Sequence, residues 1–130
     1  MAVHEFKRKP KPQVEHRSFS KPDEVRAFER GKVEVVSLGE TTFGRAVFEP
    51  GWRWSSHVKP LAKTNSCQTS HLNLHISGRL HVLMDDGKEY EFGPGDISEL
   101  PPGHDAWVVG NDPVVVIDIS GMEHYAERKK

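Results

Sequence analysis

Two glycine- and proline-rich turns in the second half of the chain most constrain how it can fold. Gly93-Pro94-Gly95-Asp96 and Pro101-Pro102-Gly103-His104 stand close together and bracket one short segment, Ile97–Leu100. Proline lacks a backbone donor and glycine adopts left-handed conformations, so such clusters interrupt regular structure. We therefore expect a short β-strand held between two turns.

The same alternation of short apolar runs and turns continues over most of the chain. From Lys32 onward the runs are rich in valine, isoleucine and aromatic residues, and Asp85-Asp86-Gly87 is a strong hairpin turn. These features predict an all-β sandwich or barrel. The expected strands are residues 32–38, 41–49, 52–59, 71–76, 80–84, 89–92, 97–100, 106–109 and 114–119.

The chain is divided by composition into a body and two polar ends. Residues 1–19 are predicted to be a polar, flexible tail, residues 20–124 the β-barrel, and residues 125–130 a charged C-terminal tail. Ser20 followed by Pro22, Asp23 and Glu24 predicts a short N-terminal helix that ends before Gly31.

Length and charge exclude several classes of protein. A chain of 130 residues forms one domain by size, and its net charge of -1 provides no field that attracts nucleic acid or an anionic membrane. No run approaches the ~20 apolar residues of a membrane span, and the N-terminus lacks the apolar core of a signal peptide. The single cysteine, Cys67, excludes an internal disulfide. We expect a cytoplasmic protein without nucleic-acid or membrane partners.

Two groups of glycines and histidines resemble the two motifs of the cupin family. The first is Gly51-x5-His57-x-Lys59, followed by His71 and Gly78, and the second is Gly95-x5-Pro101-x-Gly103-His104. The resemblance extends over residues 18–120 and implies a jelly-roll β-barrel. Within the family the chain looks like a group of small bacterial single-domain proteins, which implies a homodimer with a histidine-lined pocket.

The resemblance also implies a metal site, although three family ligand positions are changed. In typical metal-binding cupins a second histidine stands at Lys59, a glutamate at His71, and the last histidine at Ala106. Because His104 lies two residues before Ala106, it falls on the same face of an extended strand. We therefore predict that His57, His71 and His104 hold one divalent metal ion, which can be Zn, Fe, Ni or Mn. The alternatives are that His57 lines a polar pocket without metal, that His71 is a core histidine, and that His104 lies at the rim of the barrel.

Four more residues are candidates for the same pocket. Cys67 is about 13 Å from His71 in an extended chain, so it becomes a ligand only if the intervening loop folds back. As a ligand it would favour zinc. Lys59, Asn73 and His75 are assigned to binding of a small polar molecule, while Trp52 and Trp54 are assigned to the core.

The sequence leaves three functions open. The first is a metal-binding cupin that takes a small-molecule ligand or substrate, with enzymatic activity undecided. The second is a non-catalytic ligand-sensing cupin with a degenerate metal site, since Lys59 and Ala106 replace family ligands. The third is a metal-free barrel that binds a partner. No nucleophile–His–Asp order, phosphate loop or nucleotide-binding glycine pattern is present in the sequence.

Overall fold

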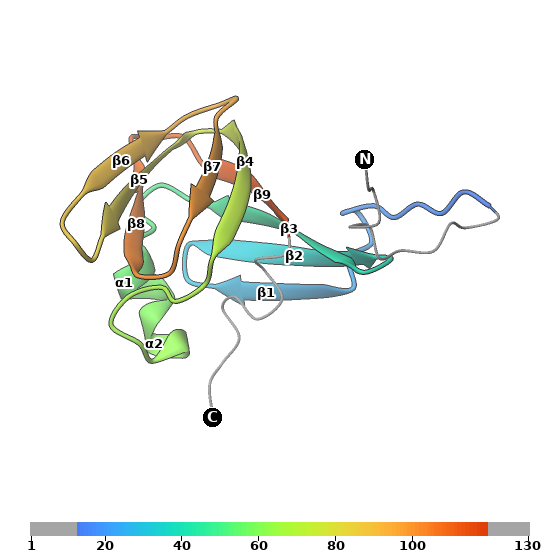
Figure 1. The fold of residues 1–130 in the computed structure, drawn as a ribbon, viewed down its shortest axis with the longest axis horizontal. Coiled ribbons are helices and arrows are strands. Elements are labelled where there is room, and N and C mark those ends of the chain that lie inside the picture. The colour runs from blue at the N-terminus through green and yellow to red at the C-terminus, as the bar shows by residue number, and fades with distance from the viewer. Residues whose placement is uncertain (1–12, 120–130) are drawn as a thin grey trace, which may run out of the picture.

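The molecule consists of two antiparallel β-sheets that face each other (Figure 1). The computed structural model describes residues 13–119. The larger sheet has the strand order β1-β2-β3-β9-β4-β7 and the smaller one β6-β5-β8. The strands are β1 (Glu24–Phe28), β2 (Gly31–Leu38), β3 (Thr41–Phe48), β4 (His71–Ser77), β5 (Arg79–Met84), β6 (Glu89–Phe92), β7 (Ile97–Leu100), β8 (His104–Val109) and β9 (Val114–Ile119).

The alternation of side chains along the strands decides which residues meet between the sheets. In β4 the residues His71, Asn73 and His75 are buried, whereas Leu72 and Leu74 between them are exposed. Strand β8 alternates in the same way. Since neighbouring side chains on a strand point to opposite faces, the buried set of each strand lines the space between the sheets. This all-β architecture confirms the predicted fold class.

The core between the sheets is built from valines and from a cluster of aromatic rings. Phe48 stacks on Trp52 with ring centroids 4.0 Å apart, and Phe28 lies 6.2 Å from Phe48. Trp52 and Trp54 are each only 2% exposed, which confirms their assignment to the core. Offset-stacked aromatic pairs of this kind stabilise a core beyond the area they bury.

Two local predictions are wrong. The segment after Ser20 forms strand β1 rather than a helix, because Glu24–Phe28 pairs with β2 residue by residue along its whole length. The predicted strand at residues 52–59 is instead two single helical turns, α1 (Trp54–His57) and α2 (Lys59–Ala62). Trp54 and Val58, four residues apart, are both buried, which is the spacing of one helical face.

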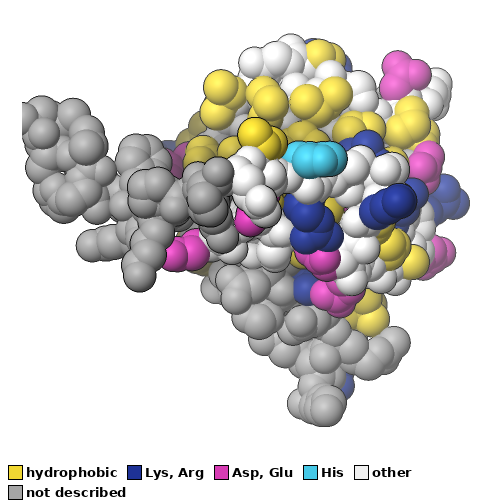
Figure 2. Space-filling model, turned by 90° about the vertical axis from the view of Figure 1, so that its right-hand side faces the viewer, with side chains coloured by type: hydrophobic (Ala, Val, Ile, Leu, Met, Phe, Trp, Pro, Cys, Tyr) yellow, Lys and Arg dark blue, Asp and Glu magenta, His cyan; other side chains and the backbone are white. Residues whose placement is uncertain are grey.

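Residues 1–12 of the predicted N-terminal tail and all of the predicted C-terminal tail lie outside the described residues. The helices within residues 13–119 are too short to cross a membrane. On the face shown in Figure 2, hydrophobic side chains gather toward the top, and basic and acidic side chains are intermixed below them.

The turn at Gly78 generates a prediction about stability. Gly78 has a φ of +77°, and a Cβ there would lie 2.3 Å from the Pro113 carbonyl oxygen. Gly78→Ala therefore adds a backbone clash to the cost of a left-handed alanine, which alone is roughly 1–2 kcal/mol. We expect a loss of more than about 2 kcal/mol in the free energy of unfolding, measured with urea.

Gly87→Ala is the matched control for this substitution. Gly87 has a φ of +90°, but a Cβ there would meet nothing within 4 Å. It should show the conformational cost alone, roughly 1–2 kcal/mol. Equal losses of stability in the two variants would show that the contact with Pro113 is unimportant.

Candidate metal centre

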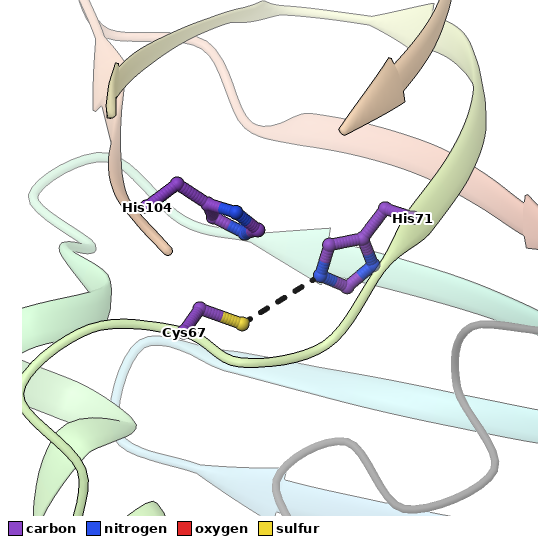
Figure 3. Close-up of side chains that lie close together, drawn as sticks. All are labelled: Cys67, His71 and His104. Carbon is purple, nitrogen blue, oxygen red and sulfur yellow. Dashed lines mark hydrogen bonds between the residues drawn. The ribbon is translucent and has the colours of Figure 1, made fainter. Parts of the chain in front are cut away.

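Three potential metal ligands come together between the two sheets (Figure 3). His71 is the first residue of β4 and His104 the first residue of β8. Cys67 lies in the loop before β4 and forms an isolated β-bridge with His104. In this bridge the Cys67 and Gly103 amides donate to the His104 and Cys67 carbonyls, both at 2.7 Å. The bridge folds the loop back and brings the thiol to the imidazoles.

The ligand atoms of this group are close enough to share one ion. The Cys67 sulfur and one ring nitrogen from each histidine all lie within 4.8 Å of one another. The Sγ atom of Cys67 is 3.7 Å from Nε2 of His71. All three residues are buried, with exposures of 3%, 6% and 3% for Cys67, His71 and His104. Such a group matches the ligand types of zinc sites.

Each histidine is oriented by a hydrogen bond on its other ring nitrogen. Nδ1 of His71 lies 2.6 Å from Oδ2 of Asp118, a carboxylate on β9 that is completely buried. Nδ1 of His104 donates to the carbonyl oxygen of Pro101 at 3.0 Å, since a carbonyl can only accept. Both histidines therefore present Nε2 to the group, an arrangement that is typical of metal-binding histidines.

The same contacts shift the acidity of the group in the protein without metal. Burial opposes ionisation of the Cys67 thiol, but hydrogen bonds with His104 and His71 outweigh it and lower the thiol pKa to about 6. Burial likewise opposes protonation of His71, but Asp118 and Cys67 raise its pKa to about 9. At neutral pH these values give a thiolate beside an imidazolium. A thiolate is the form of cysteine that binds metals.

The predicted ligand His57 does not join the group. It is the last residue of α1, where its Nδ1 accepts a hydrogen bond from the Arg53 amide at 3.0 Å. Its Nε2 lies 3.7 Å from Glu29. The helical turn is the physical reason, because the proposed convergence of His57 with the other histidines depended on an extended strand. Lys59 follows it at the start of α2 and does not line the cavity described below.

The other two residues assigned to ligand binding differ in their surroundings. Asn73 lines a small cavity together with His71 and His104. His75 is buried further along β4, where its Nε2 lies 2.9 Å from the Ser98 hydroxyl and its ring packs 5.0 Å from Phe92. Burial lowers the His75 pKa. His75 therefore lies outside the group of three ligands.

The cavity beside the group is small and contains polar atoms that lack partners. Its volume is about 30 Å³, and its apolar walls include Phe48, Leu80 and Val116. Nε1 of Trp52 and Oδ1 of Asn73 are buried and make no hydrogen bond within residues 13–119. Both side chains line this cavity. Besides the two histidines, the cavity lining therefore includes two polar side chains, Trp52 and Asn73, each with one atom that lacks a partner.

Sequence reasoning missed Asp118 and the contribution of Trp52 to the cavity. The strand Val114–Ile119 contains a single acidic residue in an otherwise apolar run. An ionisable side chain in such a run is almost never fully buried unless it is paired, so this position could have indicated a buried partner. Trp52 gave no such indication, because a tryptophan in a β-rich chain is typical of a core.

The acidity of Cys67 generates a second prediction. In the metal-free protein, the ultraviolet absorbance of the thiolate should appear with a midpoint at about pH 6. His104→Ala removes one hydrogen bond to the sulfur, so the midpoint should rise. His57→Ala lies outside the group and should leave it unchanged. A midpoint in the ordinary range for cysteine, about 8.5, in the unaltered protein would contradict the described contacts.

Comparison with known proteins identifies the fold. Protein-family models and curated proteins give no match. Among solved structures, a cupin 2 conserved barrel domain protein from Salinispora arenicola matches with a TM-score of 0.56 and 13% identity, over 85% of this chain and 88% of that one. An RmlC-like cupin family protein with a double-stranded β-helix fold from Methanocaldococcus jannaschii matches with a TM-score of 0.55 and 11% identity, over 84% and 93%.

An enzyme is among the similar structures. The polyketide cyclase RemF from Streptomyces resistomycificus matches with a TM-score of 0.58 and 12% identity, over 91% of this chain and 83% of that one. Identities this low indicate a shared architecture and leave the activity open, since one fold carries many functions. The two facing antiparallel sheets and these likenesses together show that the chain has the cupin fold.

Proposed function

We propose that this protein holds one divalent metal ion, zinc in preference to iron, through Cys67, His71 and His104. The observation that carries the proposal is the approach of these three ligand atoms to within 4.8 Å of one another in the buried interior. The small molecule that such a centre binds would enter the adjacent cavity. Three protein ligands leave a coordination position for it, as in catalytic zinc sites.

The residues present fit a zinc ion by their chemistry. A thiolate and two imidazoles are ligands that zinc prefers, whereas calcium and magnesium require oxygen. Asp118 behind His71 supplies the carboxylate that commonly supports a zinc-binding histidine. Cys67 and His104 take over from the family positions at Lys59 and Ala106, so the altered motif does not by itself make the site degenerate.

The chain's own residues would organise the chemistry around the ion. A bound zinc ion acts as a Lewis acid and makes a bound water more acidic. Asp118 keeps a proton on Nδ1 of His71, and the Pro101 carbonyl keeps one on Nδ1 of His104. The apolar walls of the cavity include Phe48, Leu80 and Val116. An enzymatic use of the cavity is compatible with this fold, which the cyclase RemF shares, and no particular reaction is assigned.

A second candidate function is thiol chemistry at Cys67 without a metal. The observation that favours it is the chain of contacts from Cys67 through His71 to Asp118, at 3.7 and 2.6 Å. A nucleophile, a base and a residue that orients the base stand in this relation in covalent catalysis, so the expectation that no nucleophile–His–Asp order is present does not hold for these contacts. The metal content of the purified protein separates the two candidates.

Elemental analysis of protein purified without a metal-affinity tag tests the first candidate. We expect about one zinc per chain, and Cys67→Ser or His104→Ala should reduce it to a small fraction, because each removes one of three ligands. His57→Ala is the matched control and should retain the metal, since His57 lies in α1. A metal-free protein with rapidly alkylated Cys67 would favour the thiol candidate instead.

Asp118→Asn provides a further prediction. The amide keeps the shape of the side chain but removes the negative charge that faces His71. We expect zinc affinity to fall by about 10- to 100-fold, as loss of such a supporting residue commonly causes. Competition with a chromophoric chelator measures this change. An unchanged affinity in a folded variant would show that Asp118 has a structural role only.

A further inference from the structure

Two buried polar atoms in the cavity require a partner that residues 13–119 do not supply. Trp52 and Asn73 are 2% and 5% exposed, so neither side chain reaches bulk water. Nε1 of Trp52 and Oδ1 of Asn73 nevertheless make no hydrogen bond. A buried polar group left in this state costs about 1–3 kcal/mol, and such groups are rare in folded proteins. Two of them in the wall of one cavity indicate that its contents provide the missing bonds.

The two atoms demand opposite hydrogen-bonding roles. The indole nitrogen carries a proton and can only donate, whereas the amide oxygen can only accept. The cavity contents must therefore offer an acceptor to Trp52 and a donor to Asn73. A hydroxyl group does both with one oxygen atom. A carboxylate or another acceptor-only group would face the Asn73 oxygen without a proton between them.

The size of the cavity limits what can carry that hydroxyl. The volume is about 30 Å³. About 10–15 Å³ of such space holds one water molecule, so the cavity takes a group of roughly two or three non-hydrogen atoms. Since His71 and His104 line the same cavity, a group held there lies beside the proposed metal site.

We infer that this cavity binds a hydroxyl group, and that Trp52 and Asn73 select it by donating to and accepting from its oxygen. The inference rests on the proposed function and extends it, because it names the ligand class of the same site. The hydroxyl belongs either to a free small alcohol or to the end of a larger molecule.

A neighbouring cleft offers space for the rest of a larger molecule. It has a volume of about 420 Å³, within the common range for small-molecule sites. Met84, Tyr90, Phe92 and Ile97 give it apolar walls. Leu100 lines both this cleft and the small cavity, so its side chain lies between the two spaces.

Nuclear magnetic resonance of the tryptophan indole groups tests the selection directly. Protein labelled with ¹⁵N at its three tryptophans would be titrated with methanol, and with acetonitrile as an acceptor-only probe of similar size. Trp52→Phe identifies the Trp52 resonance. We expect that resonance to shift with methanol in a saturable manner, and Trp54→Phe, which removes a core indole outside the cavity, to leave the shift intact.

Asn73→Leu tests whether the hydrogen bond to the Asn73 oxygen selects the hydroxyl group or whether Asn73 has only a structural role. Leucine keeps the approximate volume of asparagine but cannot accept a hydrogen bond. The preference for methanol over acetonitrile should fall by about tenfold, which corresponds to one hydrogen bond. An unchanged preference in this variant, or the lack of any saturable shift in the unaltered protein, would overturn the inference.

A series of linear alcohols distinguishes the two sources of the hydroxyl. Affinity that falls with chain length supports a free small alcohol, whereas affinity that rises supports an apolar body in the cleft. In the second case Leu100→Ala should speed binding of the long alcohols, while Ile97→Ala, which alters only the cleft, should not. No saturable binding of any alcohol would overturn both forms of the inference.

Failure of this inference is distinguishable from failure of the proposed function. The titrations are run on metal-free and on zinc-loaded protein, and zinc content is measured separately. A protein that binds no zinc but shows the Trp52 shift would refute the metal site alone. A protein that binds zinc but shows no shift in either form would refute the hydroxyl site alone.

Discussion

The contact between His71 and Asp118 is the interaction on which the interior of this barrel depends. Asp118 has no exposed surface, and its carboxylate lies 2.6 Å from the His71 ring. A buried carboxylate is strongly unfavourable unless a partner compensates it, and loss of the partner typically costs several kcal/mol. Because β4 and β9 are neighbours in the larger sheet, the contact also fixes the inner faces of two central strands.

The same contact determines the chemistry of the group around Cys67. With Nδ1 engaged by Asp118, His71 turns Nε2 toward the sulfur. The loop that carries Cys67 is held by its β-bridge to His104, so the third ligand approaches from a separate segment. Thus one buried pair and one backbone bridge assemble the three ligand atoms. Trp52 and Asn73, whose Nε1 and Oδ1 atoms lack hydrogen-bond partners within residues 13–119, line the adjoining cavity. There these two atoms can form hydrogen bonds with a molecule that binds beside the three ligands.

The strands beyond residue 71 were predictable because turn residues mark their ends and side chains alternate along them. The segment at residues 52–59 was not, since Trp52 and Trp54 fit the two-residue period of a strand, whereas Trp54 and Val58 fit the four-residue spacing of a helix. The prediction of His57 as a ligand followed from that ambiguity. The prediction of Cys67 as a ligand depended on whether its loop folds back. Tertiary contacts decide this, and the local sequence does not show them. Asp118 is not part of any sequence motif that would have marked it as a site residue. The predicted homodimer and the cytoplasmic location stay predictions.

X-ray absorption at the zinc edge is the most direct test of the central claim that these three side chains hold one ion. For the zinc-loaded protein we expect one sulfur scatterer at about 2.3 Å and nitrogen scatterers at about 2.0–2.1 Å. Cys67→Ser should remove the sulfur contribution. A spectrum of the unaltered protein that contains only oxygen and nitrogen neighbours would contradict the account, because the thiol would then lie outside the metal site.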